Sequence, residues 1–259
     1  MMKLFNYILI TTLCYMSSSH EYYTLGINNL TDITVSIDSF SGPQNYSNGS
    51  YFDSSQNSVP KGIAPYISFK QGCYPGSESK RPNKIRIRVF PSMPLLSQFG
   101  RKRNLISHIN QLFAETNKIF VNQINIRLIP SIVIPRVTDP RPINGNGEVL
   151  GDLSLFGAFL RDKPPALLNI FITNNYSGFV GAAYINVLGS KYFNYGVSKN
   201  TDSTLAHEIL HMFGAQHTFG KGGVLDYSNR LINGLLQMHP DNRVQVCGSL
   251  NYYFTKIKI

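Results

Sequence analysis

Apolar and polar residues alternate with two different periods along the chain, and these periods predict a mixed α/β domain. Apolar residues from Ile85 to Val89 alternate with Arg86 and Arg88, as in a strand with one solvent-exposed face, and we expect a Pro-containing loop to follow. Residues 104–122 instead carry apolar side chains at helical spacing. The same criteria predict strands at 124–134, 167–172 and 181–185, and helices at 153–160 and from an N-cap at Asp202 onward. The order β-α-β-α-β-β-α is typical of an α/β layered domain.

The chain before this pattern has a different character. Residues 1–19 predict a secretory signal peptide, because Lys3 precedes an apolar stretch and Ser17 and Ser19 provide the small residues of a cleavage site. Residues 20–80 are rich in Ser, Asn, Gly and Tyr, with weak strand-like alternation only at 33–37. We interpret them as an N-terminal extension or short pro-region, and residues 84–259 as the main domain.

Export is supported by two further features. No later apolar stretch is long enough to span a bilayer, so we expect no transmembrane segment and a secreted, extracellular protein. Four N-glycosylation sequons fit that route and predict a glycoprotein; they begin at Asn29, Asn45, Asn48 and Asn175.

Composition limits the class of protein and its partners. The chain is 42% apolar and 15% charged, which is typical of a globular protein. We expect the protein to be a monomer. Its formal charge is +10, with basic clusters at 80–88 and 101–103 that could attract anionic partners. The alternation at Arg86 and Arg88 favours an ordinary solvated strand face, and no nucleic-acid-binding motif is present. We therefore expect no nucleic acid partner.

Half of the six histidines lie within the eleven residues from 207 to 217. His207 and His211 are four residues apart and share one face of a helix, so that both can bind one ion. Glu208 lies beside the first ligand, where its carboxylate can act on water. Gly214 can adopt positive φ and end the helix, which allows His217 to supply a third nitrogen. Three ligands with an open fourth position are typical of a single catalytic Zn²⁺.

This region resembles the metzincin zinc metalloproteases, and among them the ADAM/reprolysin (adamalysin) group. Residues 204–208 are similar to that family's sequence leading into the zinc helix, and 181–184 to its Gly-x-Ala-Tyr edge strand. The resemblance covers roughly residues 84–250. It implies a twisted, mostly parallel five-stranded sheet, an active-site helix and a small C-terminal subdomain after Gly214. It also implies that an extended substrate pairs with the edge strand at Gly181, Ala183 and Tyr184.

The chain departs from the family below the zinc. The family has a methionine in a turn after the third histidine, whereas Leu225 occupies the best-matching position here. Leu and Met have similar volumes, so we expect packing to survive. Met238 is an alternative by identity. Tyr227 lies two residues after Leu225, where the resemblance to the astacin and serralysin branches implies a tyrosine that binds zinc or stabilises the transition state; the alternative is an ordinary exposed tyrosine.

Two cysteines, Cys73 and Cys247, remain after the signal peptide. They could form one disulfide in an oxidising compartment. Alternatively, the Cys73 thiolate could occupy the fourth zinc position and block the site, as a pro-region cysteine does in many metzincins, with Lys80-Arg81 as a processing site.

These observations predict a secreted zinc metalloendopeptidase that hydrolyses proteins or peptides, with Glu208 as the general base. The alternative is a secreted host-interacting or toxin-like binding protein on a metalloprotease scaffold with weak catalysis. Because Glu208 and all three histidines are intact, the sequence favours the enzyme.

Overall fold

The structure is a computed structural model, in which residues 23–25, 33–39, 65–134, 149–176, 179–227 and 230–257 are described. The expected signal peptide and three of the four sequons lie outside these residues. Asn175, in the fourth sequon, is exposed.

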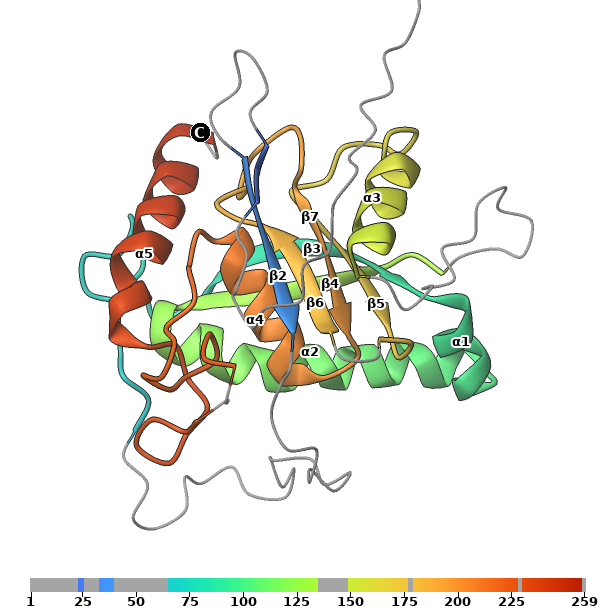
Figure 1. Ribbon diagram of the computed structural model, residues 1–259. Coiled ribbons are helices and arrows are strands. Elements are labelled where there is room, and N and C mark those ends of the chain that lie inside the picture. The colour runs from blue at the N-terminus through green and yellow to red at the C-terminus, as the bar shows by residue number, and fades with distance from the viewer. Residues whose placement is uncertain are drawn as a thin grey trace, which may run out of the picture.

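The strands of the described residues form one seven-stranded sheet in the order β1-β2-β6-β7-β5-β3-β4 (Figure 1). The strands β4, β3, β5 and β7 run parallel to one another, whereas β6 is antiparallel to β7. These five strands are the mostly parallel sheet that was predicted, and β1 and β2 extend it beyond β6. The bounds are β1 (Tyr23–Leu25), β2 (Ile33–Ser39), β3 (Asn83–Pro91), β4 (Ile126–Ile132), β5 (Leu168–Thr173), β6 (Phe179–Tyr184) and β7 (Tyr195–Lys199).

Helices cover both faces of the sheet. The helices are α1 (Met93–Phe99), α2 (Lys102–Ile124), α3 (Val149–Leu160), α4 (Asp202–Met212) and α5 (Arg243–Tyr252), with a short 3₁₀-helix η1 (Pro240–Asn242) and a π-helix η2 (Tyr253–Ile257). Phe156 of α3 packs on Tyr195 of β7, whereas Glu208 of α4 lies against Gly181, which pairs with Ser198, a residue of β7 on the opposite face from Tyr195. Adjacent strand residues point to opposite faces, so the sheet lies between α3 and α4. The predicted α/β architecture is confirmed, including a C-terminal part in which α5 lies to one side (Figure 1).

Three details differ from the sequence-based expectations. The segment after β3 is helix α1 rather than a loop, because Ser92 Oγ accepts a hydrogen bond from the Leu95 N–H and Pro94 lies in the first turn, where proline is tolerated. Strand β7 was not predicted. The N-cap of α4 is Thr201 rather than Asp202, which is the first helical residue.

Residues 65–82 pack against the same core, although they precede residue 84. Phe69 is buried, and its N–H donates to the Gln123 carbonyl at 2.7 Å. The hydroxyl of Tyr74 lies 3.0 Å from the Ile124 carbonyl, and burial raises the pKa of Tyr74 to about 12. Cys73 forms a disulfide with Cys247 in α5. Of the two roles left open for Cys73, the structure therefore has the disulfide rather than a zinc ligand.

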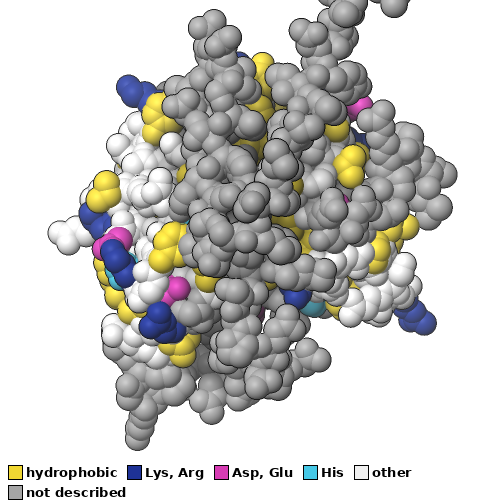
Figure 2. Space-filling model, viewed as in Figure 1, with side chains coloured by type: hydrophobic (Ala, Val, Ile, Leu, Met, Phe, Trp, Pro, Cys, Tyr) yellow, Lys and Arg dark blue, Asp and Glu magenta, His cyan; other side chains and the backbone are white. Residues whose placement is uncertain are grey.

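The basic residues of β3 lie on a solvated strand face. Lys84 and Arg86 are exposed and Arg88 is half-buried, while Ile85 and Ile87 are buried, as the alternation predicted. On the face shown in Figure 2, the visible Lys and Arg side chains are scattered rather than gathered over one element. No helix among the described residues is both long and apolar enough to cross a membrane.

Candidate metal centre

Helix α4 places two of the three histidines. Thr201 Oγ1 accepts a hydrogen bond from the Thr204 N–H at 3.3 Å, which satisfies one of the free donors at the start of the helix. The helix ends at Met212, and Gly214 has φ 95°, a conformation that a residue with a Cβ rarely adopts. The chain reverses there, as its sequence predicted, and carries His217 back to the helix.

The three predicted ligands come together. The Nε2 atoms of His207 and His211 are 3.0 Å apart, and each lies 3.2 Å from Nε2 of His217. Three nitrogens that bind one Zn²⁺ tetrahedrally are about 3.3 Å apart at normal Zn–N bond lengths. His211 is completely buried, and His217 is only partly so. The triad therefore has the size of a metal site.

Hydrogen bonds at the other ring nitrogens fix two of these imidazoles. Nδ1 of His207 donates to the Val224 carbonyl at 2.6 Å, and Nδ1 of His211 donates to the Ala215 carbonyl at 2.7 Å. Because a carbonyl only accepts, each Nδ1 carries the proton in the neutral ring and each Nε2 carries a lone pair. Lone pairs that converge at 3.0 Å repel unless a cation lies between them. The donor set thus fits a divalent metal with nitrogen ligands.

A tight turn that includes Val224 and Leu225 bonds to His207 and to the residue after His217. The Val224 carbonyl binds His207, while the Leu225 carbonyl accepts from the N–H of Thr218, the residue after His217. The Asp226 carboxylate closes the turn by accepting from the Gly222 N–H at 2.7 Å. The Leu225 side chain is fully buried. The residue at the expected methionine position thus lies in a turn that contacts the candidate ligand His207 through its backbone.

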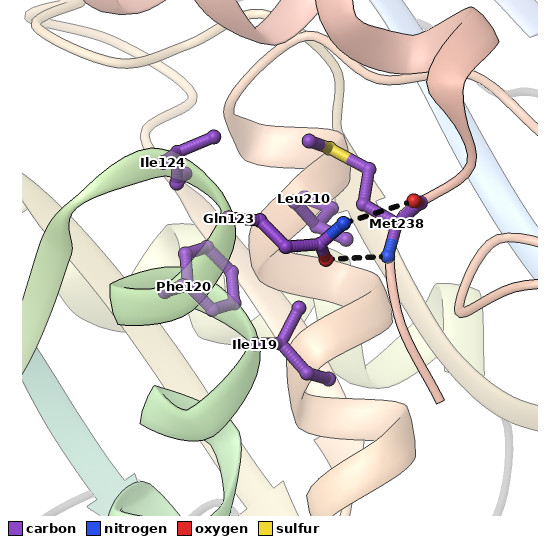
Figure 3. A pocket seen from close by; sticks show the side chains of 6 residues that line it. All are labelled: Ile119, Phe120, Gln123, Ile124, Leu210 and Met238. Atoms are coloured by element: carbon purple, nitrogen blue, oxygen red, sulfur yellow. Dashed lines mark hydrogen bonds between the residues drawn. The ribbon is translucent and has the colours of Figure 1, made fainter. Parts of the chain in front are cut away.

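Met238, the alternative by identity, lies elsewhere. It borders a small pocket between α2 and α4, together with Phe120 and Leu210 (Figure 3). The Gln123 side chain accepts from the Met238 N–H at 2.7 Å and donates to its carbonyl at 3.1 Å, as Figure 3 shows. Met238 therefore anchors the C-terminal segment to α2.

Aromatic rings surround the third ligand. The ring of Tyr227 lies 4.7 Å from that of His217 and 6.4 Å from that of His207, measured between centroids. Phe219, whose side chain is 41% exposed, lies 5.1 Å from His217 and 5.5 Å from Tyr227. The structure thus brings Tyr227 to the triad. The position of Phe219 beside the triad was not predicted. Its place two residues after His217 in the sequence is the one signal that could have indicated it.

Glu208 is completely buried and lies against β6. A Cβ on Gly181 would come within 2.2 Å of Glu208 Oε1 and 2.8 Å of the Val197 carbonyl oxygen. The absence of a side chain at Gly181 therefore makes the space that the Glu208 carboxylate occupies. Burial is the largest cause that raises the pKa of Tyr176. The charge of Asp152, a hydrogen bond with Asp152 and the charge of Glu208 raise this pKa further. Tyr176 consequently remains a neutral phenol in the electrostatic field of Glu208.

We expect Gly181→Ala to destabilise the fold by about 1–3 kcal/mol, since overpacking displaces Glu208 and strains the contact with β7. Gly248→Ala in α5 is the matched control, because nothing lies within 4 Å of the position that its new Cβ would take. It should stabilise the protein slightly, because alanine favours helix. Urea unfolding of both variants measures the difference, and equal stabilities would contradict the close packing of Gly181.

The residues predicted to bind substrate all lie in β6, which is not at the edge of the sheet. Strand β2 pairs antiparallel along it, with Ile37 opposite Ala182 and Ser36 opposite Ala183. Ala183 shares the α4 face with Gly181, while Tyr184 is buried on the other face, 5.0 Å from the ring of Tyr195. The edge expected from the sequence is thus covered by the chain's own N-terminal part.

Comparisons with known proteins give no family assignment. No family model matches the sequence, and no curated protein does. Among solved structures, metalloproteinase-II from Bacteroides fragilis has a TM-score of 0.48 and 18% identity, over 74% of this chain and 59% of that one. A structure of a chaperone–substrate complex also has a TM-score of 0.48, with 16% identity over 68% of this chain and 35% of the other. This chain thus spans less than two thirds of the length of either protein.

Proposed function

We propose that the protein is a zinc-dependent endopeptidase of the metzincin type that acts outside the cell on proteins or peptides. The observation that carries the proposal is the triad of His207, His211 and His217, with Nε2 atoms 3.0–3.2 Å apart and two Nδ1 atoms bound to carbonyls. Glu208, the neighbour of the first ligand, supplies the proton acceptor that hydrolysis requires. The particular likeness to ADAM/reprolysin enzymes rests on the sequence resemblance.

The chain's residues divide the work of hydrolysis. When bound, Zn²⁺ would lower the pKa of a coordinated water molecule and polarise the scissile carbonyl. Glu208 would accept a proton as the water oxygen attacks the carbonyl carbon, and then deliver it to the amine nitrogen as the C–N bond breaks. Tyr227 would donate a hydrogen bond to the oxyanion that forms, a role supported by the distance of 4.7 Å between its ring and that of His217.

The substrate would pair with β6. Peptides add to sheets through main-chain hydrogen bonds, and Gly181 and Ala183 belong to the strand next to Glu208. Since β2 pairs with that side of β6, a substrate has to replace it. This fits a pro-region that includes β2, whereas the part of residues 20–80 around Cys73 stays joined to α5 by the disulfide. Residues 1–19 remain a proposed signal peptide, and the Cys73–Cys247 disulfide is consistent with an oxidising compartment.

Zinc should bind once per chain and stabilise the fold. Dialysis with a chelator should abolish hydrolysis of a peptide library, and added Zn²⁺ should restore it. At a free zinc concentration of 100 times Kd, binding should stabilise the protein by about 2.7 kcal/mol. His211→Ala should remove both effects, whereas His108→Ala, which alters a histidine bonded to Asn200 away from the triad, should retain them. Stoichiometric zinc in His211→Ala would contradict the assigned ligands.

A further inference from the structure

Strand β2 occupies the side of β6 that faces away from the rest of the sheet (Figure 1). Its register places Val35 opposite Tyr184 and Asp38 opposite Gly181. The other side of β6 is paired with β7. A further strand can therefore pair with β6 only in the position that β2 holds.

That position is next to the candidate base. The Glu208 carboxylate lies against Gly181, and the residue opposite Gly181 in β2 is one strand spacing away, about 4.8 Å. A peptide that is to reach Glu208 by pairing with β6 thus needs the same main-chain donors and acceptors as β2. Its binding and that of β2 are mutually exclusive.

We propose that β2 is an internal competitor for the β6 edge, and that the Cys73–Cys247 disulfide decides which cuts in the chain can release it. The proposal rests on the proposed function, because it concerns the regulation of the same site. Its second part, that only a cut before Cys73 separates β2 from the disulfide-bonded chain, holds whether or not the site is catalytic.

The disulfide and its surroundings fasten the segment that follows β2. Cys73 is bonded to α5, Phe69 is hydrogen-bonded to α2, and the Ile67 N–H donates to the Gln237 side chain at 2.8 Å. The dibasic pair Lys80-Arg81 is exposed but lies after Cys73 in the sequence. A cut there leaves β2 on the same fragment as Cys73, and that fragment stays covalently attached to Cys247.

A cut between Ser39 and Cys73 has the opposite result. Strand β2 then belongs to a fragment without a disulfide, and only non-covalent contacts hold it to β6. Linking a segment to its site gives it an effective concentration of about millimolar for a short connection, and dilution of a severed segment removes this advantage. Release of β2 therefore requires cleavage before Cys73, and the Lys80-Arg81 pair is not the site that achieves it.

The experiment uses two full-length proteins with the same inserted recognition sequence for a specific protease. One carries it between Ser47 and Asn48 and the other directly after Arg81, both in a Glu208→Gln background that prevents cleavage of the probe. The probe is an extended peptide with one tryptophan, since the chain has no Trp that would add background fluorescence. Binding is measured without reductant before each cut. The cut protein is then diluted, and binding is measured again.

The cut after Ser47 should tighten peptide binding at least tenfold, whereas the cut after Arg81 should leave it unchanged. Unchanged binding after the first cut, or equal tightening after both, would overturn the proposal. The same cut is made in a protein that retains Glu208. A peptide that binds there after the cut at Ser47 but is never hydrolysed would contradict the proposed function and leave the role of β2 as a competitor intact.

Proline substitutions in the uncut chain give a second test. Residues 36 and 37 of β2 pair only with β6, because β1 pairs with 33–35. In an antiparallel ladder, successive N–H groups point alternately toward and away from a given neighbour. Of Ser36→Pro and Ile37→Pro, one should therefore weaken the pairing and raise peptide binding severalfold more than the other. Equal peptide affinity in both variants and the parent would argue against competition by β2.

Discussion

Replacing Glu208 with Gln should lower the rate of peptide hydrolysis by about 10²–10⁴-fold, the contribution usual for a positioned general base. Glutamine has nearly the same shape as glutamate, so it fits the space beside Gly181 that the buried carboxylate occupies. The amide cannot accept the proton of the attacking water. Zinc binding should persist, because the three imidazoles and their carbonyl partners are unchanged.

The measurement is kcat/KM on a cleaved library peptide, together with zinc content and thermal stability of the same sample. Glu115→Gln is the control, since Glu115 is paired with Lys118 on α2 and takes no part in the site. It should keep full activity. Retained hydrolysis in Glu208→Gln would refute the assigned mechanism, and loss of zinc together with activity would indicate a structural rather than a chemical role for Glu208.

The parts of the site that are local in sequence could be predicted. His207 and His211 lie one helical turn apart, and the backbone freedom of Gly214 brings His217 to them within a few residues. The main sheet could also be predicted, because a buried strand such as β5 is a short, mostly apolar run. These features depend on periodicity and on the conformational range of single residues, which a sequence displays directly.

The parts of the fold and the site that depend on contacts between residues distant in sequence could not be predicted. The carbonyl of Val224 orients His207 from 17 residues away, and any residue type could provide that oxygen. The alternation at 33–37 was only weakly strand-like, and it gave no sign of the partner of this strand, which is β6, nearly 150 residues later. Strand β7 was missed because Tyr195–Lys199 contains a glycine and a lysine, and its burial comes from neighbours on both sides.

The pairing of Cys73 also connects distant parts of the chain, and its removal should have the largest effect on stability. The double variant Cys73→Ala/Cys247→Ala should lower the free energy of unfolding by about 3–5 kcal/mol, because the bond closes a long loop and restricts the unfolded chain. The two cysteines are separated by 174 residues, nearly the whole described domain. Both are buried, so alanine leaves little unsatisfied polarity.

Guanidinium unfolding of the double variant and of the parent, with and without reductant, separates the bond from its packing. Reductant should destabilise the parent by nearly the amount that the double substitution does, and should leave the double variant unchanged. A change below about 1 kcal/mol would show that the 65–82 segment holds to α2 and α5 without the bond. In that case the fragment that carries β2 would stay bound after a cut at Arg81 even without the bond, and packing rather than the disulfide would decide which cuts release it.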